Sequence, residues 1–490
     1  MHQMRRLRQD LQRVCQQKPA QPEKTRILHR YRNSIRSRLP GKLLRLRRVR
    51  KRLPDRRSRL ENKEIKHRAK KAAIITLGCR LNHADTALLT RRLECAGFEA
   101  VASDTAQLDL ILINSCAVTA EAVRKSRQTL RQYRKKYPEA IIVVSGCAAL
   151  ISETEMKLDG ASIVFGNNGK KQLQDFLNDL STEEDNSFNA VFTENAVSSF
   201  PFRSRAFIKI QEGCNNFCTY CIVPHVRGRE RSRSFEEAVA DCRNAVAAGF
   251  PEIILTGVNT CAYFDNGRTL GDLIRAVANI EGDFRIRLSS TEPNFKNLGL
   301  LDVMAETPKV CRFLHISLQH GCDRILQRMN RHYTASEFSR FVDMAREKMP
   351  DIHIGTDVIA GFPGETDADF EECLKFTEKI KFANTHIFTY SRRPGTPAAD
   401  YPDQIQSAVS AVRAAELRKV AQNSTFEFAE NQIGKTLDVI FEQCRNGKLT
   451  GWSDNYLGVT ANADEFQTGK IVKVTASREN LAILKGVALE

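Results

Sequence analysis

The chain of 490 residues lacks the features of several large protein classes. No apolar run approaches the roughly 20 residues that a membrane-spanning helix needs, so a membrane protein is excluded. The first residues contain no continuous apolar stretch of the kind that forms a secretory signal, so export is not indicated. With 42% hydrophobic and 27% charged residues, the chain is neither a collagen nor wholly disordered. Its length predicts about three domains of a globular protein.

Surplus positive charge is missing from most of the chain, although the formal net charge is +17. Residues 1–71 hold 26 lysines and arginines against five acidic residues, whereas the remainder has 49 basic and 53 acidic residues. The remainder can therefore bind nucleic acid only through local patches. Residues 1–71 are too repulsive and too poor in apolar side chains to form a core, so we expect a basic, disordered extension. An RNA-binding arm, a misassigned start and an organellar address are the open interpretations of that extension.

A disulfide framework is not expected for the 14 cysteines, because a chain that is not exported stays in a reducing compartment. Cys214, Cys218 and Cys221 form a CxxxCxxC run that can grip one metal centre. A structural zinc site needs a fourth ligand, and no cysteine follows within twenty residues, which leaves only His225 to close such a site. On a 4Fe-4S cluster, three thiolates leave one iron free to bind a small molecule.

A CxxxCxxC run with an aromatic residue before its last cysteine resembles the radical S-adenosylmethionine (SAM) enzymes. The resemblance implies that Cys214, Cys218 and Cys221 hold a 4Fe-4S cluster whose free iron binds the amino and carboxylate groups of SAM. It also implies that Tyr220 packs against the adenine of this cofactor.

Six strand-like runs alternate with helical patterns around and after this motif, and they predict an incomplete parallel barrel of the (β/α)6 type. These runs are 206–211, 252–257, 284–290, 312–318, 353–360 and 385–390. Polar residues that follow barrel strands lie where such barrels carry their chemistry. Five of them resemble the SAM-binding positions of the family: Gly257, Asn259, Glu292, Gln319 and Glu365. Among these, Glu292 and Gln319 would bond the ribose or the amino-acid part of SAM.

A second set of cysteines follows three strand-like runs near the start of the globular part. Runs 73–78, 108–115 and 140–146 are followed by Cys79, Cys116 and Cys147, with helical patterns at 84–96 and 118–137 between them. A β-α-β-α-β unit brings the carboxyl ends of its parallel strands to one edge, where open α/β sheets bind ligands. The alternative is that all three are ordinary buried cysteines.

The sequence around these cysteines resembles that of the amino-terminal domain of the methylthiotransferases. The matching stretches are Thr76–Asp85 (TLGCRLNHAD), Asn114–Thr119 (NSCAVT) and Ser145–Cys147 (SGC). The resemblance implies a flavodoxin-like or doubly wound α/β domain in which Cys79, Cys116 and Cys147 hold an auxiliary 4Fe-4S cluster.

The carboxyl end predicts a small antiparallel β-barrel of a kind that often handles RNA. Its expected strands are 437–442, 448–453, 456–460, 470–475 and 482–487. It resembles the TRAM domain of the methylthiotransferases, and a capping barrel without a ligand is the alternative. The predicted domains are 1–71 (extension), 72–183 (auxiliary-cluster domain), 200–430 (radical SAM core) and 431–490 (TRAM-like barrel).

The resemblance implies a radical reaction on tRNA, because the C2 hydrogen of adenine is not acidic and general base catalysis cannot remove it. Residues 207–214, 256–260 and 114–116 look most like the bacterial threonylcarbamoyladenosine branch. Members of that branch convert N6-threonylcarbamoyladenosine at tRNA position 37 to its 2-methylthio derivative. A 5'-deoxyadenosyl radical activates C2, the auxiliary cluster supplies sulfur, and a second SAM supplies the methyl group.

The implied cofactors are two 4Fe-4S clusters and SAM, with no catalytic residue beyond the clusters. The implied partners are tRNA and an electron donor such as a flavodoxin or ferredoxin, with an unknown sulfur source and no membrane, in the cytoplasm. Three alternatives remain open at this point. They are the isopentenyladenosine-37 branch, the ribosomal-protein aspartate branch, and a zinc-containing RNA-binding protein without enzymatic activity.

Overall fold

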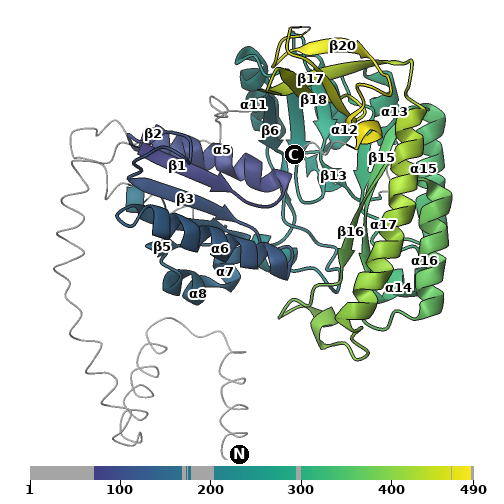
Figure 1. Cartoon of the computed structure of the whole chain (residues 1–490), viewed down its shortest axis with the longest axis horizontal. Coiled ribbons are helices and arrows are strands. Elements are labelled where there is room, and N and C mark those ends of the chain that lie inside the picture. The colour runs from purple at the N-terminus through teal and green to yellow at the C-terminus, as the bar shows by residue number, and fades with distance from the viewer. Residues whose placement is uncertain are drawn as a thin grey trace, which may run out of the picture. The chain divides into compact units, whose positions relative to one another are not determined.

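The computed structural model describes residues 71–167, 173, 175–177, 204–293, 299–464 and 466–486 (Figure 1). The basic extension predicted for residues 1–71 lies outside these ranges except for Lys71, which begins the first strand. The predicted junction between residues 183 and 200 also lies outside them. Within the described ranges, no helix combines the length and the apolar character that crossing a membrane requires.

The first domain is a five-stranded parallel sheet in the order β2-β1-β3-β4-β5. Its strands are β1 (Lys71–Thr76), β2 (Glu99–Ala100), β3 (Leu110–Ser115), β4 (Ile141–Gly146) and β5 (Ile163–Val164). Its helices are α5 (Arg80–Cys95), α6 (Ala120–Lys136), α7 (Cys147–Ile151) and α8 (Glu153–Leu158). All six residues of the central strand β3 are buried, as expected for a parallel sheet covered on both faces. The strand order is flavodoxin-like and reverses between β1 and β3, which is where such sheets bind ligands.

The second domain is an incomplete parallel barrel, as predicted. Its strands are β6 (Arg205–Lys209), β9 (Glu252–Thr256), β12 (Arg285–Leu288), β13 (Ser290–Thr291), β14 (Phe313–Ile316), β15 (His353–Ala360) and β16 (Asn384–Thr389). The sheet β12-β9-β6 and the sheet β13-β14-β15-β16 are parallel throughout. The run predicted at 284–290 is split at Ser289 into β12 and β13, so six barrel positions are built from seven strands.

Helices follow the barrel strands, and four of them begin at a side-chain cap. They are α10 (Val223–Arg227), α11 (Phe235–Ala247), α12 (Leu270–Ala278), α13 (Gly299–Glu306), α14 (Asp323–Arg328), α15 (Ala335–Lys348), α16 (Asp367–Ile380) and α17 (Ser407–Glu430). Thr269, Thr334 and Thr366 each form a reciprocal capping box that satisfies free N–H groups of a first turn. Ser234 accepts the N–H of Glu237 at the start of α11. The short elements are β7 (Gln211–Glu212), β8 (Arg231–Ser232), β10 (Phe264–Asp265), β11 (Arg268–Thr269), η3 (Thr260–Ala262) and η4 (Pro397–Asp400).

The carboxyl-terminal domain is an antiparallel sheet in the order β19-β18-β17-β20. Its strands are β17 (Thr436–Arg445), β18 (Lys448–Ser453), β19 (Gly458–Asn462) and β20 (Ile471–Thr475). The fifth strand predicted at 482–487 is wrong, because η5 (Ala482–Lys485) is a 3-10 helix. Leu481 forms one bridge to Val459 and is buried in the domain core, and the chain then turns away. A short apolar run fits a buried turn as well as a strand.

Buried arginines of β12 join the barrel to this sheet. Arg285 and Arg287 pair with the buried Glu252 of β9. Their remaining N–H groups donate to backbone carbonyl oxygens of the carboxyl-terminal domain, at Asp438, Trp452, Ser453 and Asp454. Every charge in this junction has a partner, which is the condition under which buried charges are tolerated.

Candidate active site

Cys79, Cys116 and Cys147 come together at one edge of the first sheet. Thr76 of β1 is paired with Asn114 of β3, and Ser115 is paired with Gly146 of β4, so the three strands end in register. Each cysteine follows one of these ends, and all three line the same cavity. The prediction that the sheet gathers these thiols at its carboxyl edge agrees with the structure.

Two glycines allow the close approach of these loops. Gly78 has φ of +102°, and a Cβ added there would lie 2.6 Å from Cys116 Sγ. Gly146 has φ of +96°, and its Cβ would lie 2.3 Å from the Ser115 carbonyl oxygen. Both positions therefore require glycine for conformation and for space.

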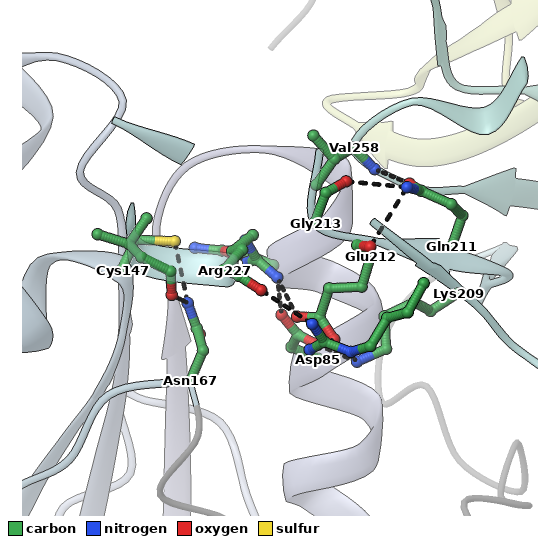
Figure 2. Close-up of polar contacts among 12 residues, drawn as sticks. Asp85, Cys147, Asn167, Lys209, Gln211, Glu212, Gly213, Arg227 and Val258 are labelled. Carbon is green, nitrogen blue, oxygen red and sulfur yellow. Dashed lines mark hydrogen bonds and ion pairs between the residues drawn. The ribbon is translucent and has the colours of Figure 1, made fainter. Parts of the chain in front are cut away.

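Asn82 and Arg227 fix the loop that carries Cys79. The Asn82 side-chain amide donates to the carbonyl oxygens of Leu77 (2.6 Å) and Ser115 (3.1 Å). Its Oδ1 accepts a hydrogen bond from Arg227 Nη2 at 2.6 Å. Arg227 Nη1 also bonds Asp85 and Glu212, each at 3.0 Å (Figure 2). A buried guanidinium from the barrel domain thus anchors the first turn of α5.

The surroundings of these three thiols fit a thiolate-bound cluster. Burial raises the pKa of Cys116 to about 11, and the neighbouring thiols Cys79 and Cys147 contribute to the shift. Burial also raises the pKa of Cys147, whereas the charge of Arg227 and a hydrogen bond from Asn167 Nδ2 to Sγ (3.3 Å) favour its thiolate. Thiolate ligation and hydrogen bonds to sulfur are the means by which proteins hold and tune iron–sulfur clusters.

Cys214, Cys218 and Cys221 lie in one loop between β7 and α10. Hydrogen bonds from the segment after α14 hold this loop: Thr219 N–H donates to the Met329 carbonyl (3.0 Å), and Asn330 Nδ2 donates to the Asn216 carbonyl (3.0 Å). Gly213 begins the loop with φ of +73°, and a Cβ there would lie 2.0 Å from the Arg229 carbonyl oxygen.

Burial opposes ionisation of two thiols in this loop, and hydrogen-bond donors reach two of its sulfur atoms. Burial, reinforced by Cys218, raises the pKa of Cys214 to about 11 and that of Cys221 to about 12. Arg331 Nη1 donates to Cys218 Sγ at 3.2 Å, and the Asn216 N–H donates to Cys214 Sγ at 3.4 Å. In the described ranges no three His, Cys, Asp or Glu side chains are spaced to bind a single metal ion, and His225 is exposed.

A cavity of about 520 Å³ lies beside this loop and contains two of the predicted SAM-binding residues, Asn259 and Glu292. Glu292 forms an ion pair with Arg331, which also lines the cavity. Asn259 Oδ1 is buried and has no hydrogen-bond partner within the described residues. A cavity of this size, lined by an unsatisfied amide oxygen and by the ion pair of Glu292 with Arg331, suits a polar, nucleoside-sized ligand such as SAM.

The other predicted SAM-binding residues lie in different places. Tyr220 lies in the loop that carries Cys218 and Cys221 and packs against an apolar group that includes Cys322 and Phe362. Gly257 lies at the end of β9 and lines the cavity of the first cysteine set. Gln319 and Glu365 line neither of the two cavities described here.

Local backbone contacts account for the environments of Gln319 and Glu365. Gln319 has φ of +72° and bridges β15 by exchanging backbone hydrogen bonds with Asp357 and Ile359. The Glu365 carboxylate is buried, accepts the N–H groups of Gly361 and Phe362, and pairs with Arg413 at 2.7 Å.

A cavity of about 570 Å³ is lined by residues of both domains. The three cysteines of the first sheet, Gly257 and Val258 after β9, and Ser289 and Ser290 after β12 form one part of its wall. His315, Asp357 and His386 of the barrel interior and Tyr456 of the carboxyl-terminal domain form another part. Cys79, Cys116 and Cys147 therefore line the same cavity as residues from the inside of the barrel.

The predictions missed the residues that connect the two cysteine sets. Gln211 Oε1 accepts the N–H groups of Val258 (2.9 Å) and Asn259 (3.0 Å), and its Nε2 donates to the Gly213 carbonyl (2.8 Å; Figure 2). Arg227 follows Cys221 by only six residues and reaches Asn82 in the first sheet. The position of Arg227 close to a cysteine motif is the one feature of the local sequence that could have drawn attention to it. The local sequence does not indicate that its partner is Asn82.

Comparisons with known proteins agree with this arrangement. The family model "Radical SAM superfamily" matches residues 208–377, and "Uncharacterized protein family UPF0004" matches residues 71–166. Among solved structures, a radical S-adenosylmethionine methyltransferase, TsrM, from Kitasatospora setae matches with a TM-score of 0.52 and 16% identity. The match covers 78% of this chain and 80% of that one, and it supports the fold. The class is thus that of the radical SAM proteins.

Curated relatives narrow the class. Threonylcarbamoyladenosine tRNA methylthiotransferase MtaB of Bacillus subtilis is 36% identical over 423 residues, covering 82% of this chain and 92% of the relative. The tRNA-2-methylthio-N(6)-dimethylallyladenosine synthase of Pelotomaculum thermopropionicum is 33% identical over 440 residues, covering 85% and 97%. The chain belongs to the radical SAM tRNA methylthiotransferase family. The cofactors of this family are SAM and two [4Fe-4S] clusters.

Proposed function

We propose that this protein is the enzyme that converts N6-threonylcarbamoyladenosine at tRNA position 37 to its 2-methylthio derivative. The observation that carries the proposal is the cavity of about 570 Å³, in which the auxiliary thiols face the interior of a radical SAM barrel. Identities of 35–36% to MtaB enzymes over most of the chain support the threonylcarbamoyl substrate. A transfer of sulfur to a base requires a sulfur-bearing site and a radical-generating site next to one chamber, which is this arrangement.

We also propose which residues hold the cofactors. Cys214, Cys218 and Cys221 would hold the radical SAM cluster, and Cys79, Cys116 and Cys147 the auxiliary cluster. SAM would lie in the cavity of about 520 Å³, near Asn259, Glu292 and Arg331. Each thiol loses its proton when it binds iron, and the N–H groups of Arg331 and Asn167 then bond to sulfur that carries negative charge.

When bound, these cofactors supply a radical that can activate C2 of adenine, together with the sulfur and methyl groups of the product. The chain itself positions these groups. Gln211 ties the loop after β9 to the start of the cysteine loop, so two walls of the site keep a fixed spacing. The target base has to leave its stack to reach a cavity inside the protein, as base-modifying enzymes generally require.

The proposed function also implies an electron donor and a domain that contacts tRNA. We expect a flavodoxin or ferredoxin to reduce the clusters, and the carboxyl-terminal sheet to contact tRNA as a TRAM-like domain. The domain boundaries 72–183, 200–430 and 431–490 are part of this proposal.

Nucleoside mass spectrometry of total tRNA tests the proposed function. A strain without this protein would lose 2-methylthio-threonylcarbamoyladenosine and accumulate its unthiolated precursor, and a plasmid copy would restore the product. A change in the dimethylallyl nucleoside instead would assign the protein to the other tRNA branch. No change in either nucleoside would overturn the proposal.

A further inference from the structure

The cavity beside the auxiliary cysteines has a polar wall that thiol chemistry alone does not require. Its lining includes Arg80, His315, Asp357, His386 and Tyr456 in addition to the three cysteines. These residues come from α5, three barrel strands and the carboxyl-terminal domain. A cavity that receives only an adenine ring and an apolar substituent has no need of such groups.

Arg80 places a positive charge in this cavity directly after Cys79. Its guanidinium carbon lies 5.0 Å from the ring centroid of Tyr456 and 5.5 Å from that of Phe313. Among the residues that the structure describes, no carboxylate forms an ion pair with it. The Tyr456 side chain accepts one hydrogen bond from Arg80. A guanidinium carries five N–H donors, so others remain for a carboxylate.

The other polar groups of this wall form a connected set on neighbouring strands. His315 Nε2 lies 3.0 Å from Asp357 Oδ2, and the rings of His315 and His386 are 5.4 Å apart between centroids. Although burial opposes the shift, the hydrogen bond and charge of His315 keep the pKa of Asp357 below its usual value. Burial, together with His315 and Arg80, lowers the pKa of His386, so its ring is neutral and can both donate and accept.

The two tRNA nucleosides modified by this chain's relatives differ in the group on N6. A threonylcarbamoyl group carries a carboxylate, a hydroxyl and amide N–H groups, whereas a dimethylallyl group is a hydrocarbon. In adenine, C2 and C6 flank the same ring nitrogen, so the N6 substituent lies beside the carbon that receives sulfur. A residue next to an auxiliary cysteine is therefore well placed to contact the substituent.

We propose that Arg80 binds the carboxylate of the threonylcarbamoyl group and so determines the substrate, while the His315–Asp357–His386 set bonds its hydroxyl and amide groups. This inference rests on the proposed function and names the part of the cavity that selects between the two nucleosides. A site built to hydrogen-bond polar substrate groups rejects an analogue that lacks them, because its own groups are then left unpaired.

The test compares an anticodon stem-loop carrying threonylcarbamoyladenosine with the same stem-loop carrying its methyl ester, whose charge is removed. Enzyme with both clusters reconstituted is assayed by mass spectrometry of the nucleosides. For the natural enzyme, kcat/KM for the acid should exceed that for the ester by about tenfold to a hundredfold, the range for one hydrogen bond to a charged group. In Arg80→Gln this acid-to-ester ratio should fall close to one, and Arg80→Lys should restore a part of it.

Matched measurements separate this inference from other effects. Arg91→Gln removes an exposed arginine of the same helix that does not line the cavity, and its acid-to-ester ratio should stay unchanged. Iron content and visible absorbance of each variant show whether the neighbouring Cys79 still holds its cluster. If the Arg80→Gln cluster is lost, the ratio in Arg80→Lys decides, and a ratio of one there overturns the inference.

Two other outcomes are distinct. A natural-like acid-to-ester ratio in Arg80→Gln overturns the role of Arg80 and leaves the proposed function intact. A natural enzyme that modifies only the dimethylallyl stem-loop overturns both.

Discussion

Cys214, Cys218 and Cys221 fall within eight residues of one loop, whereas Cys79, Cys116 and Cys147 are spread over 69 residues and three strands. The first set is shaped by its own loop and by bonds from the segment after α14. The second set exists only when β1, β3 and β4 are paired in register, and it depends on Arg227 from the other domain. One protein thus uses a local and a non-local construction for two similar groups of thiols, and the non-local one is more sensitive to global folding.

The largest expected effect comes from removing one thiol of either set. Cys214→Ala and Cys79→Ala should each abolish the methylthiolated product and reduce iron from about eight to about four atoms per chain. Cys214→Ala should also stop the formation of 5'-deoxyadenosine from SAM, whereas Cys79→Ala should retain it. Chromatography with mass spectrometry measures both products, and tRNA binding should change little. Full product formation by Cys79→Ala would refute the assignment of the second set.

The next largest effect is expected from a glycine substitution beside Cys116, and a second glycine variant distinguishes close packing from backbone conformation as its cause. Gly78→Ala places a methyl group against Cys116 Sγ, so we expect loss of the auxiliary cluster and about half of the iron. Gly97→Ala is the matched control, because Gly97 has φ of +81° but open space around it. It should cost about 1 kcal/mol through its backbone alone and keep both clusters. Equal iron contents in the two variants would show that close packing at Gly78 is unimportant.

A smaller effect should follow from breaking the network between the domains. Arg227→Gln removes a buried cation that Asp85 and Glu212 share, and breaking buried ion pairs costs about 3–5 kcal/mol. Arg231→Gln removes a half-exposed arginine that pairs with the same Glu212, and it should cost less than about 1 kcal/mol. Urea denaturation measures both free energies of unfolding. Similar values for the two variants would contradict the distinction between buried and exposed pairs.

The smallest effect is a pH dependence of the same network. Burial opposes the shift, but Lys209 and Arg227 lower the pKa of Asp85 from 3.8 to about 2. The ionised carboxylate therefore contributes stability that is complete above about pH 4 and is lost as the pH falls toward 2. By linkage, this contribution is on the order of 2 kcal/mol.

Acid titration of unfolding in Asp85→Asn tests that contribution. The variant should be less stable at neutral pH, and its stability should change less between pH 4 and 2. Glu121→Gln, which alters an exposed pair with Arg124, should leave this part of the curve nearly as it is in the natural protein. An unchanged acid slope in Asp85→Asn would contradict the assignment.

The contrast between local and non-local contacts also explains which parts of the site could be predicted from the sequence. The spacing of Cys214, Cys218 and Cys221 is local and identifies its site directly, and the repeated strand-then-cysteine pattern was sufficient to predict the second set. Arg227 and Arg331 could not be predicted, because their partners Asn82 and Cys218 lie 145 and 113 residues away. The alternation of strands and helices in the first two domains was predictable from the sequence pattern. The 3-10 helix at Ala482–Lys485 was not, since its short apolar run has no distinctive period.

Tyr456 has a consequence for exchanging parts between relatives. This residue lies in the turn between β18 and β19 of the carboxyl-terminal domain, lines the cavity of about 570 Å³ and packs against Arg80 of α5. A chimera that takes this domain from another methylthiotransferase would therefore also take part of the wall of this cavity, along with any tRNA-binding surface. Preference for a nucleoside should then travel with the transplanted module whenever its residue at this position differs from tyrosine.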